Sequence, residues 1–395
     1  MTVRALISFL TIMLAAQATS AKGGPSNLQT PVHENAAFDE QKLAELRRGE
    51  PVVTRLQPNH KQEVAVYGMV RVQVLPEVFL QSFRETIATK SNPAILEIGR
   101  FGRMPTLDDL KLLTMERRDI EDLKKCVVGN CELKLSAKMI EQFQKTMDWR
   151  STDHIAQATQ LYQQMLLEYV RDYLERGDAA LIEYSDKPKP VSLLDGQRAL
   201  LASIPTFSDE SSENGSSLST RGWLPIEDTI VWSKIKFGLK PVLAINHIVI
   251  FKSEREYEPQ ILVLSKQIYA NHYFDASIAL TGLARNPEGG HYLFYENHSL
   301  ADGLQGMFTG IKRRLIERQA VDGLKGVLVQ TRMKLDALAV NQSENGQTSK
   351  AATSWRLPRK QSIFFLFCIV VLALVSYRWR ASIRPIARYV FGQTS

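Results

Sequence analysis

Histidines are the side chains of this sequence best suited to do chemistry. Of seven histidines, four lie in late segments with a strand pattern, namely His247, His272, His291 and His298. Imidazole ligates metal ions and titrates near neutral pH, so several on one sheet face, with Asp275 or Glu296, would form a metal site or an acid–base pair. No His-Glu-x-x-His spacing accompanies them. We therefore predict local polar partners, with no metal and no cofactor. An envelope hydrolase or metal-dependent enzyme using these histidines is the alternative.

Aromatic and polar side chains are concentrated in the segment Asn271-His272-Tyr273-Phe274-Asp275, and more tyrosines follow in the next predicted strand. Concave ligand pockets are mostly apolar and carry a few polar anchors. Ordinary sheet packing by aromatic residues is the alternative explanation. The residues predicted to bind a ligand are His272, Tyr273, Asp275, Tyr292 and Tyr295.

Cys126 and Cys131 enclose the short segment Val127-Val128-Gly129-Asn130. Glycine and asparagine favour tight turns, which would bring the two thiols together. In an oxidising compartment such a pair forms a structural disulfide. A redox-active pair, a metal site and free thiols are the alternatives, although the spacing is not Cys-x-x-Cys.

The net charge of +7 comes from one end of the chain. After residue 345 there are eight basic residues and no acidic one, which leaves 41 basic against 42 acidic residues in the rest. A nearly neutral folded part does not predict a nucleic-acid partner. Basic residues beside an apolar segment instead indicate contact with anionic membrane lipid.

Both ends of the chain have the pattern of an exported, anchored protein. Arg4, the apolar segment Ala5–Ala16 and the small residues Ala18–Ala21 predict a signal peptide over residues 1–21. Residues 361–378 predict a single transmembrane helix, since Gln361–Tyr377 is uncharged and 17 residues of helix rise about 25 Å. We expect a cell-envelope protein with its domain in the periplasm and a cytoplasmic tail over residues 379–395. An uncleaved N-terminal anchor and a buried core helix are the alternatives.

Between these ends, hydrophobic periodicity indicates a mixture of strands and helices. Strands are predicted over Gln62–Leu75, Ile95–Phe101, Ala179–Tyr184, Pro241–Lys252, Gln260–Ala284 (one bent strand or a hairpin) and Gly290–His298. Helices are predicted over Asp39–Arg48, Pro76–Thr86, Asp108–Leu113, Asp119–Lys125, Ser136–Met147, Asp153–Arg176, Leu193–Ser203 and Leu304–Leu338, the last with a break at Asp322-Gly323.

These elements predict an α+β fold, in which a long C-terminal helix packs on an antiparallel sheet, with inserted helices and one C-terminal transmembrane helix. The domain is expected over residues 61–340, after a flexible lead-in over residues 22–60. Residues 341–360 are expected to link it to the transmembrane helix. A polar stretch, Ser208–Thr220, is predicted to be a surface loop.

Four stretches have a distinctive pattern, namely Cys126-x-x-Gly129-Asn130-Cys131-Glu132-Leu133-Lys134-Leu135, Trp232-Ser233-Lys234 to Phe237-Gly238-Leu239-Lys240-Pro241, Tyr269 to Ala276, and Tyr295 to Ser299 leading to Lys312-Arg313-Arg314. Together they resemble a group of uncharacterised bacterial envelope proteins. The order of elements over residues 60–338 is also similar to the helix-grip layout of START-type lipid-binding domains, except for the inserted helix Asp153–Arg176. That resemblance implies a ligand held between a curved sheet and the final helix.

The function predicted from these features is a membrane-anchored periplasmic binding module for a hydrophobic or lipid-like ligand, rather than an enzyme. Its expected partners are membrane lipid, a hydrophobic small molecule and an envelope protein, and no nucleic acid is expected. A structural or assembly role in an envelope complex is a further alternative.

Overall fold

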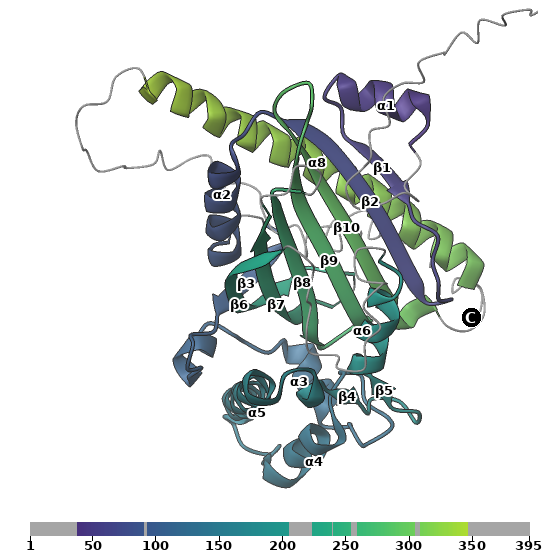
Figure 1. The fold of residues 1–395 in the computed structure, drawn as a ribbon. Coiled ribbons are helices and arrows are strands. Elements are labelled where there is room, and N and C mark those ends of the chain that lie inside the picture. Colours follow the sequence, from purple (N-terminus) through teal and green to yellow (C-terminus); the bar gives the residue numbers. More distant parts are fainter. Residues whose placement is uncertain are drawn as a thin grey trace, which may run out of the picture. The chain divides into compact units, whose positions relative to one another are not determined.

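An antiparallel sheet of eight strands organises the domain, in the spatial order β1-β2-β10-β9-β8-β7-β6-β3 (Figure 1). The computed structural model describes residues 38–90, 93–204, 223–238, 240–253, 259–304 and 309–346. Contacts divide the chain into Met1–Thr30 and Pro31–Ser395, and all described residues belong to the second unit. The strands are β1 (Val52–Arg55), β2 (Glu63–Val72), β3 (Ile95–Arg100), β6 (Leu224–Ile235), β7 (Val242–Lys252), β8 (Ile261–Ala270), β9 (Phe274–Arg285) and β10 (His291–Ala301).

Helices pack on this sheet and extend beyond one end of it. Their bounds are α1 (Glu40–Arg47), α2 (Pro76–Ala88), α3 (Arg117–Leu123), α4 (Ala137–Thr146), α5 (His154–Arg176), α6 (Leu193–Leu201) and α8 (Thr309–Gly346), with the 3₁₀ turns η1 (Leu107–Leu110), η2 (Gly177–Ala180) and η3 (Asp302–Leu304). A two-stranded ribbon joins β4 (Glu183–Tyr184) to β5 (Val191–Ser192). Helix α8 packs on β2 and β1, and α6 packs on β9. Figure 1 shows α3, α4, α5 and the ribbon grouped at one end of the sheet. The predicted α+β class is confirmed.

The contact between α8 and β2 follows from the alternation of side chains along a strand. Valines at every second position of β2 enter the core beneath α8, and these are Val64, Val66, Val70 and Val72. Gly68 occupies the central position in this row, where the helix side chains Leu324 and Leu328 are fully buried. The missing side chain allows the helix to lie close to the strand, and the leucines fill the space.

We expect Gly68→Ala to lower the free energy of unfolding by about 1–3 kcal/mol, because the added carbon overpacks this contact. A Cβ at this position would meet Leu328 at 2.7 Å and Leu324 at 2.9 Å. Gly326→Ala, on α8 itself, is the matched control, since a Cβ there meets nothing within 4 Å. That change should stabilise the helix by up to about 1 kcal/mol. Urea denaturation of both variants measures the difference, and two equal values would contradict the packing argument.

The structure departs from the sequence prediction at several elements. The segment predicted as a bent strand or a hairpin is the hairpin β8–β9. Helix α8 continues through Asp322-Gly323, where a break was expected, because one glycine costs a long, packed helix only about 1 kcal/mol. Of the strand predicted over Ala179–Tyr184, only Glu183–Tyr184 forms a strand, and its first two residues belong to the turn η2. The domain also begins before residue 61, because β1 pairs with β2.

Strand β6 was missed entirely, and it becomes central to the site described below. Its first half is exposed and contains Pro225, Glu227 and Asp228, residue types that are uncommon in strands. A bulge between Pro225 and Glu227 accommodates the proline in the pairing with β7. Long-range pairing therefore makes a strand of residues whose local preference is for a loop.

No helix in the described ranges combines the length and the apolar character that crossing a bilayer requires. The predicted signal peptide, the loop Ser208–Thr220 and the predicted transmembrane helix over residues 361–378 lie outside the described residues. These three remain predictions.

Candidate ligand-binding site

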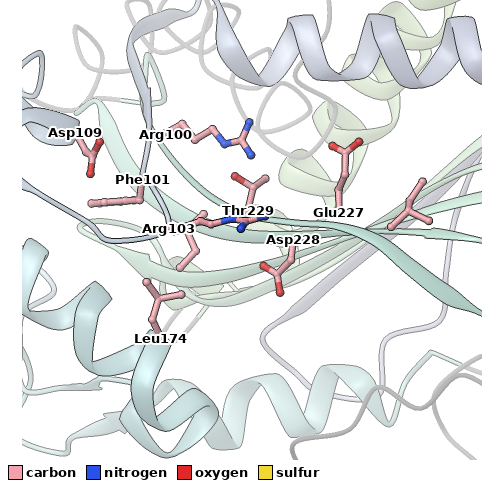
Figure 2. Close-up of a pocket in the computed structure, with 11 residues that line it drawn as sticks. Arg100, Phe101, Arg103, Asp109, Leu174, Glu227, Asp228 and Thr229 are labelled. Carbon is pink, nitrogen blue, oxygen red and sulfur yellow. The ribbon is translucent and has the colours of Figure 1, made fainter.

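A pocket of about 740 Å³ lies beside the first half of β6, where β3 has ended (Figure 2). The last hydrogen bond between the two segments runs from the Phe101 N–H to the Ile230 carbonyl, 2.9 Å. Among the described strands, residues 224–229 of β6 pair only with β7. The pocket is lined by Arg100, Phe101, Gly102, Arg103, Asp109, Leu174, Ile226, Glu227, Asp228, Thr229 and Ile230.

The wall formed by residues 100–109 is held in place by contacts with distant elements. The indole Nε1–H of Trp232 donates to the Asp109 carbonyl, 2.9 Å. From α5, the Arg171 guanidinium donates to the Pro105 carbonyl through Nε (3.0 Å) and Nη2 (2.7 Å). Because β6 and α5 each fix this segment, the pocket wall does not depend on the loop's own conformational preference.

Apolar side chains make up one part of the lining and continue onto the surface around it. Phe101 is buried, whereas Leu174 and Ile226 are 48% and 42% exposed. Close to them in sequence, Met104 is 86% and Leu224 68% exposed. Exposed apolar residues gathered beside a pocket are typical of ligand grooves and interaction surfaces.

The three carboxylates of the lining already have partners. Asp109 accepts the Thr106 N–H at 2.8 Å as part of a capping box. Glu227 forms an ion pair with Arg84 of α2. Asp228 lies 2.7 Å from Nε2 of His247, and this hydrogen bond holds the pKa of the Asp228 carboxyl below its usual range.

His247 is hydrogen-bonded on both sides of its ring. A carboxylate can only accept, so Nε2–H donates to Asp228, and in the neutral ring Nδ1 accepts the Tyr173 hydroxyl proton at 2.8 Å. Burial raises the pKa of Tyr173, which therefore stays a neutral donor. This chain of contacts positions Asp228 at the pocket edge and leaves neither ring nitrogen of His247 available to a substrate.

Two of the predicted binding residues, His272 and Tyr273, lie in the tight turn between β8 and β9. His272 Nε2 is 3.1 Å from both carboxylate oxygens of Asp119, which belongs to α3. Tyr273 has a left-handed backbone with φ of 63°, and its hydroxyl accepts the Lys240 N–H at 3.0 Å. Both side chains therefore hold the hairpin turn against neighbouring segments and face no pocket of the described chain that we identify.

The third predicted residue, Asp275, belongs to a buried charge cluster. Its carboxylate lies 2.6 Å from the Lys134 ammonium group, which is only 2% exposed. Asp186 and Asp302 lie 3.8 Å from the same nitrogen. Burial raises the pKa of Asp186. This cluster joins β9 and the turn η3 to the segment that lies between β3 and β6.

Tyr292 and Tyr295 are not brought to these three residues. On β10, Tyr292 lies opposite Ala284, nine residues along β9 from Asp275, a distance of about 30 Å in an extended strand. Tyr292 and Tyr295 also point to opposite faces, because they are three positions apart. The five predicted residues therefore do not lie together, and both tyrosines are buried in the sheet.

The late histidines are dispersed and do not converge. His291 Nε2 lies 2.7 Å from Oε1 of Gln260, and His247 and His272 have the separate partners described above. Within the described residues, no group of three or more histidine, cysteine or acidic side chains could hold a metal ion.

His298 lies between two glutamates in the sheet interior. Nδ1 is 2.7 Å from Glu63 and Nε2 is 2.7 Å from Glu296, and all three side chains are at most 2% exposed. Burial by itself lowers the pKa of His298, but the hydrogen bonds and charges of the two glutamates outweigh it and raise the pKa to about 9. The imidazolium is therefore the form present at neutral pH.

Cys126 and Cys131 form the predicted disulfide. The enclosed turn is fixed to the segment before β5, since the Gly129 N–H donates to the Ser185 carbonyl at 2.7 Å and the Cys131 N–H to the Asp186 carbonyl at 2.9 Å. Gly129 has φ of 85°, which glycine adopts without strain. The bond stabilises a turn next to the Lys134 cluster.

The residues that line the pocket were not singled out in the sequence, although one local signal exists. Arg100-Phe101-Gly102-Arg103 follows a predicted strand and combines two cations, an aromatic ring and a glycine. Their partner wall lies more than 120 residues later, on the missed strand β6. No family model, curated protein or solved structure matches this chain.

Proposed function

We propose that this protein is an envelope-anchored binding module whose pocket between the end of β3, the start of β6 and α5 takes a lipid-like, amphipathic molecule. The observation that carries the proposal is a lining that joins apolar side chains to two arginines, Arg100 and Arg103. A volume of about 740 Å³ lies within the range of pockets for small organic ligands, roughly 300–1,000 Å³. The exposed apolar residues around the pocket suit the entry of an acyl chain.

The envelope location rests on the apolar segments predicted at residues 1–21 and 361–378. A domain anchored next to a bilayer would encounter amphipathic molecules at high local concentration. The layout is helix-grip-like, in that α8 lies across the sheet. However, Leu324 and Leu328 closely fill the contact at Gly68. We therefore assign the ligand to the β3–β6 edge and not to the space beneath α8.

Photolabelling tests the proposed ligand class. The full-length chain, reconstituted in phosphatidylcholine nanodiscs, is exposed to a dodecanoic acid carrying a diazirine, and labelled peptides are identified by mass spectrometry. Labels are expected on residues 100–109 and 224–230. Ile226→Ser should reduce labelling about tenfold, because it removes apolar contact area from the pocket wall.

Met333→Ser is the matched control, since Met333 is an exposed apolar residue of α8, 66% accessible. It should label like the unaltered chain. Labels distributed evenly over the surface, or equal labelling of Ile226→Ser and Met333→Ser, would refute ligand binding in the pocket. Crosslinking of one envelope protein to Leu224 and Met104, with no lipid label on the pocket, would instead indicate that this surface binds a protein partner.

A further inference from the structure

Two arginines of the pocket are free to recognise an anion. Arg100 and Arg103 are exposed, and neither side chain makes a hydrogen bond or an ion pair within the described chain. None of the nearby carboxylates forms an ion pair with them, since Asp109 accepts the Thr106 N–H, Glu227 pairs with Arg84 and Asp228 with His247. The N–H donors of both guanidinium groups therefore line the pocket without a hydrogen-bond acceptor in the described chain.

The two arginines are carried by backbone that is already fixed. Arg100 ends β3 and lies opposite Val231 in the sheet. Arg103 lies between the Phe101 N–H, bonded to Ile230, and the Pro105 carbonyl, bonded to Arg171. A site that is ordered before binding does not lose backbone entropy when the ligand arrives, which favours affinity.

A buried hydroxyl adds a third polar group to this wall. Thr229 is 6% exposed, and its Oγ1 has no hydrogen-bond partner in the part of the chain that the structure describes. Buried polar atoms without a partner are uncommon and costly. Figure 2 shows Thr229 on the same side of β6 as the Arg100 guanidinium, with Asp228 and Leu174 on the opposite side.

We infer that Arg100, Arg103 and Thr229 form the head-group subsite of the pocket and bind a phosphate or carboxylate group, while the apolar wall contacts the attached chain. Planar guanidinium groups pair with these anions through two parallel hydrogen bonds. The inference rests on the proposed function, because it assigns one end of the same ligand. A lipid head group and a free phosphate ion share this chemistry.

Equilibrium binding to the full-length chain in phosphatidylcholine nanodiscs tests the subsite, with dodecyl phosphate, dodecanoate, dodecanol and inorganic phosphate as separate probes. The unaltered chain should bind both anionic alkyl probes at least about tenfold more tightly than dodecanol, as expected for charge-assisted hydrogen bonds. The double variant Arg100→Gln/Arg103→Gln should remove that preference. Arg117→Gln/Arg118→Gln, on the exposed face of α3, removes the same charge elsewhere and should change nothing.

The outcomes distinguish failure of the head-group subsite from failure of the amphipathic pocket. Equal affinity of the unaltered chain for dodecanol and dodecyl phosphate, or a preference that survives in Arg100→Gln/Arg103→Gln, would overturn the head-group subsite while the amphipathic pocket stands. Binding of inorganic phosphate as tightly as dodecyl phosphate, with no affinity for dodecanol, would keep the anion subsite and overturn the lipid-like ligand. A chain that binds none of the four probes would refute both.

Discussion

Replacing Lys134 with methionine should lower the free energy of unfolding by about 3–5 kcal/mol, the largest effect that we expect from a single substitution. The ammonium group of Lys134 lies 2.6 Å from Asp275 and 3.8 Å from both Asp186 and Asp302. Methionine preserves much of the side-chain length but removes the cation. Because Asp275 is buried, its carboxylate would then lack both its counter-charge and most of its access to water.

Two further substitutions identify the charge as the cause. The double variant Lys134→Met/Asp275→Asn removes both members of the shortest ion pair and should recover much of the lost stability, since a buried pair contributes little once neither charge is present. Lys111→Met is the exposed control. Its pair with Asp108 joins side chains that are 63% and 75% exposed, and its loss should cost no more than about 0.5 kcal/mol.

Urea denaturation followed by near-ultraviolet circular dichroism measures all three variants. A loss below about 1 kcal/mol for Lys134→Met would show that water or another cation reaches Asp275. In that case the cluster would not stabilise the junction between the sheet and the small helices.

Raising the pH from about 6.5 to 9 should cost the domain about 3 kcal/mol of stability through His298 alone. The imidazole donates to Glu63 and Glu296, and its pKa is raised from 6.5 to about 9 in the folded chain. Below pH 6.5 the ring is protonated in both the folded and the unfolded chain, so the stabilisation is fully present. Between pH 6.5 and 9 the unfolded ring loses its proton first, and the stabilisation decreases until it is absent above pH 9.

The variant His298→Gln should be less stable than the unaltered chain at pH 6 and should show a nearly flat stability profile from pH 6.5 to 9. His60→Gln is the matched control, because His60 is exposed and its side chain forms no part of the cluster. It should retain the alkaline decrease. Isothermal urea titrations at half-unit pH intervals give the profiles, and measurements stop at pH 9, because tyrosines of the unfolded chain ionise near pH 10. A flat profile for the unaltered chain would mean that His298 is neutral in the folded state.

Local patterns in the sequence determined the regular elements that stabilise the domain. The valine alternation of β2, the apolar stripe of α5 and the antiparallel pattern of the late strands each depend on residues within one element. The disulfide between Cys126 and Cys131 was also predictable, since a gap of five positions containing glycine and asparagine brings two thiols together by itself. In these places the local preference and the final packing agree.

The partners of the polar residues could not be read from the sequence. His272 was predicted to have a local polar partner, but its partner is Asp119, 153 positions earlier in the chain. His298 required Glu63 from β2, and Asp275 required Lys134. Charged groups in a buried sheet must find partners wherever the topology places them, and sequence distance carries no information about that choice.

The sequence by itself determined an α+β chain with a large antiparallel sheet, a long closing helix and a small disulfide loop, because hydrophobic periodicity and turn chemistry act over a few residues. Only the tertiary structure decided where a ligand could bind. The pocket combines Arg100 and Arg103 with Leu174 and with residues Ile226–Ile230 of β6. The first half of β6 has little strand propensity. Pairing with β7 on one side, and the end of β3 on the other, created that surface.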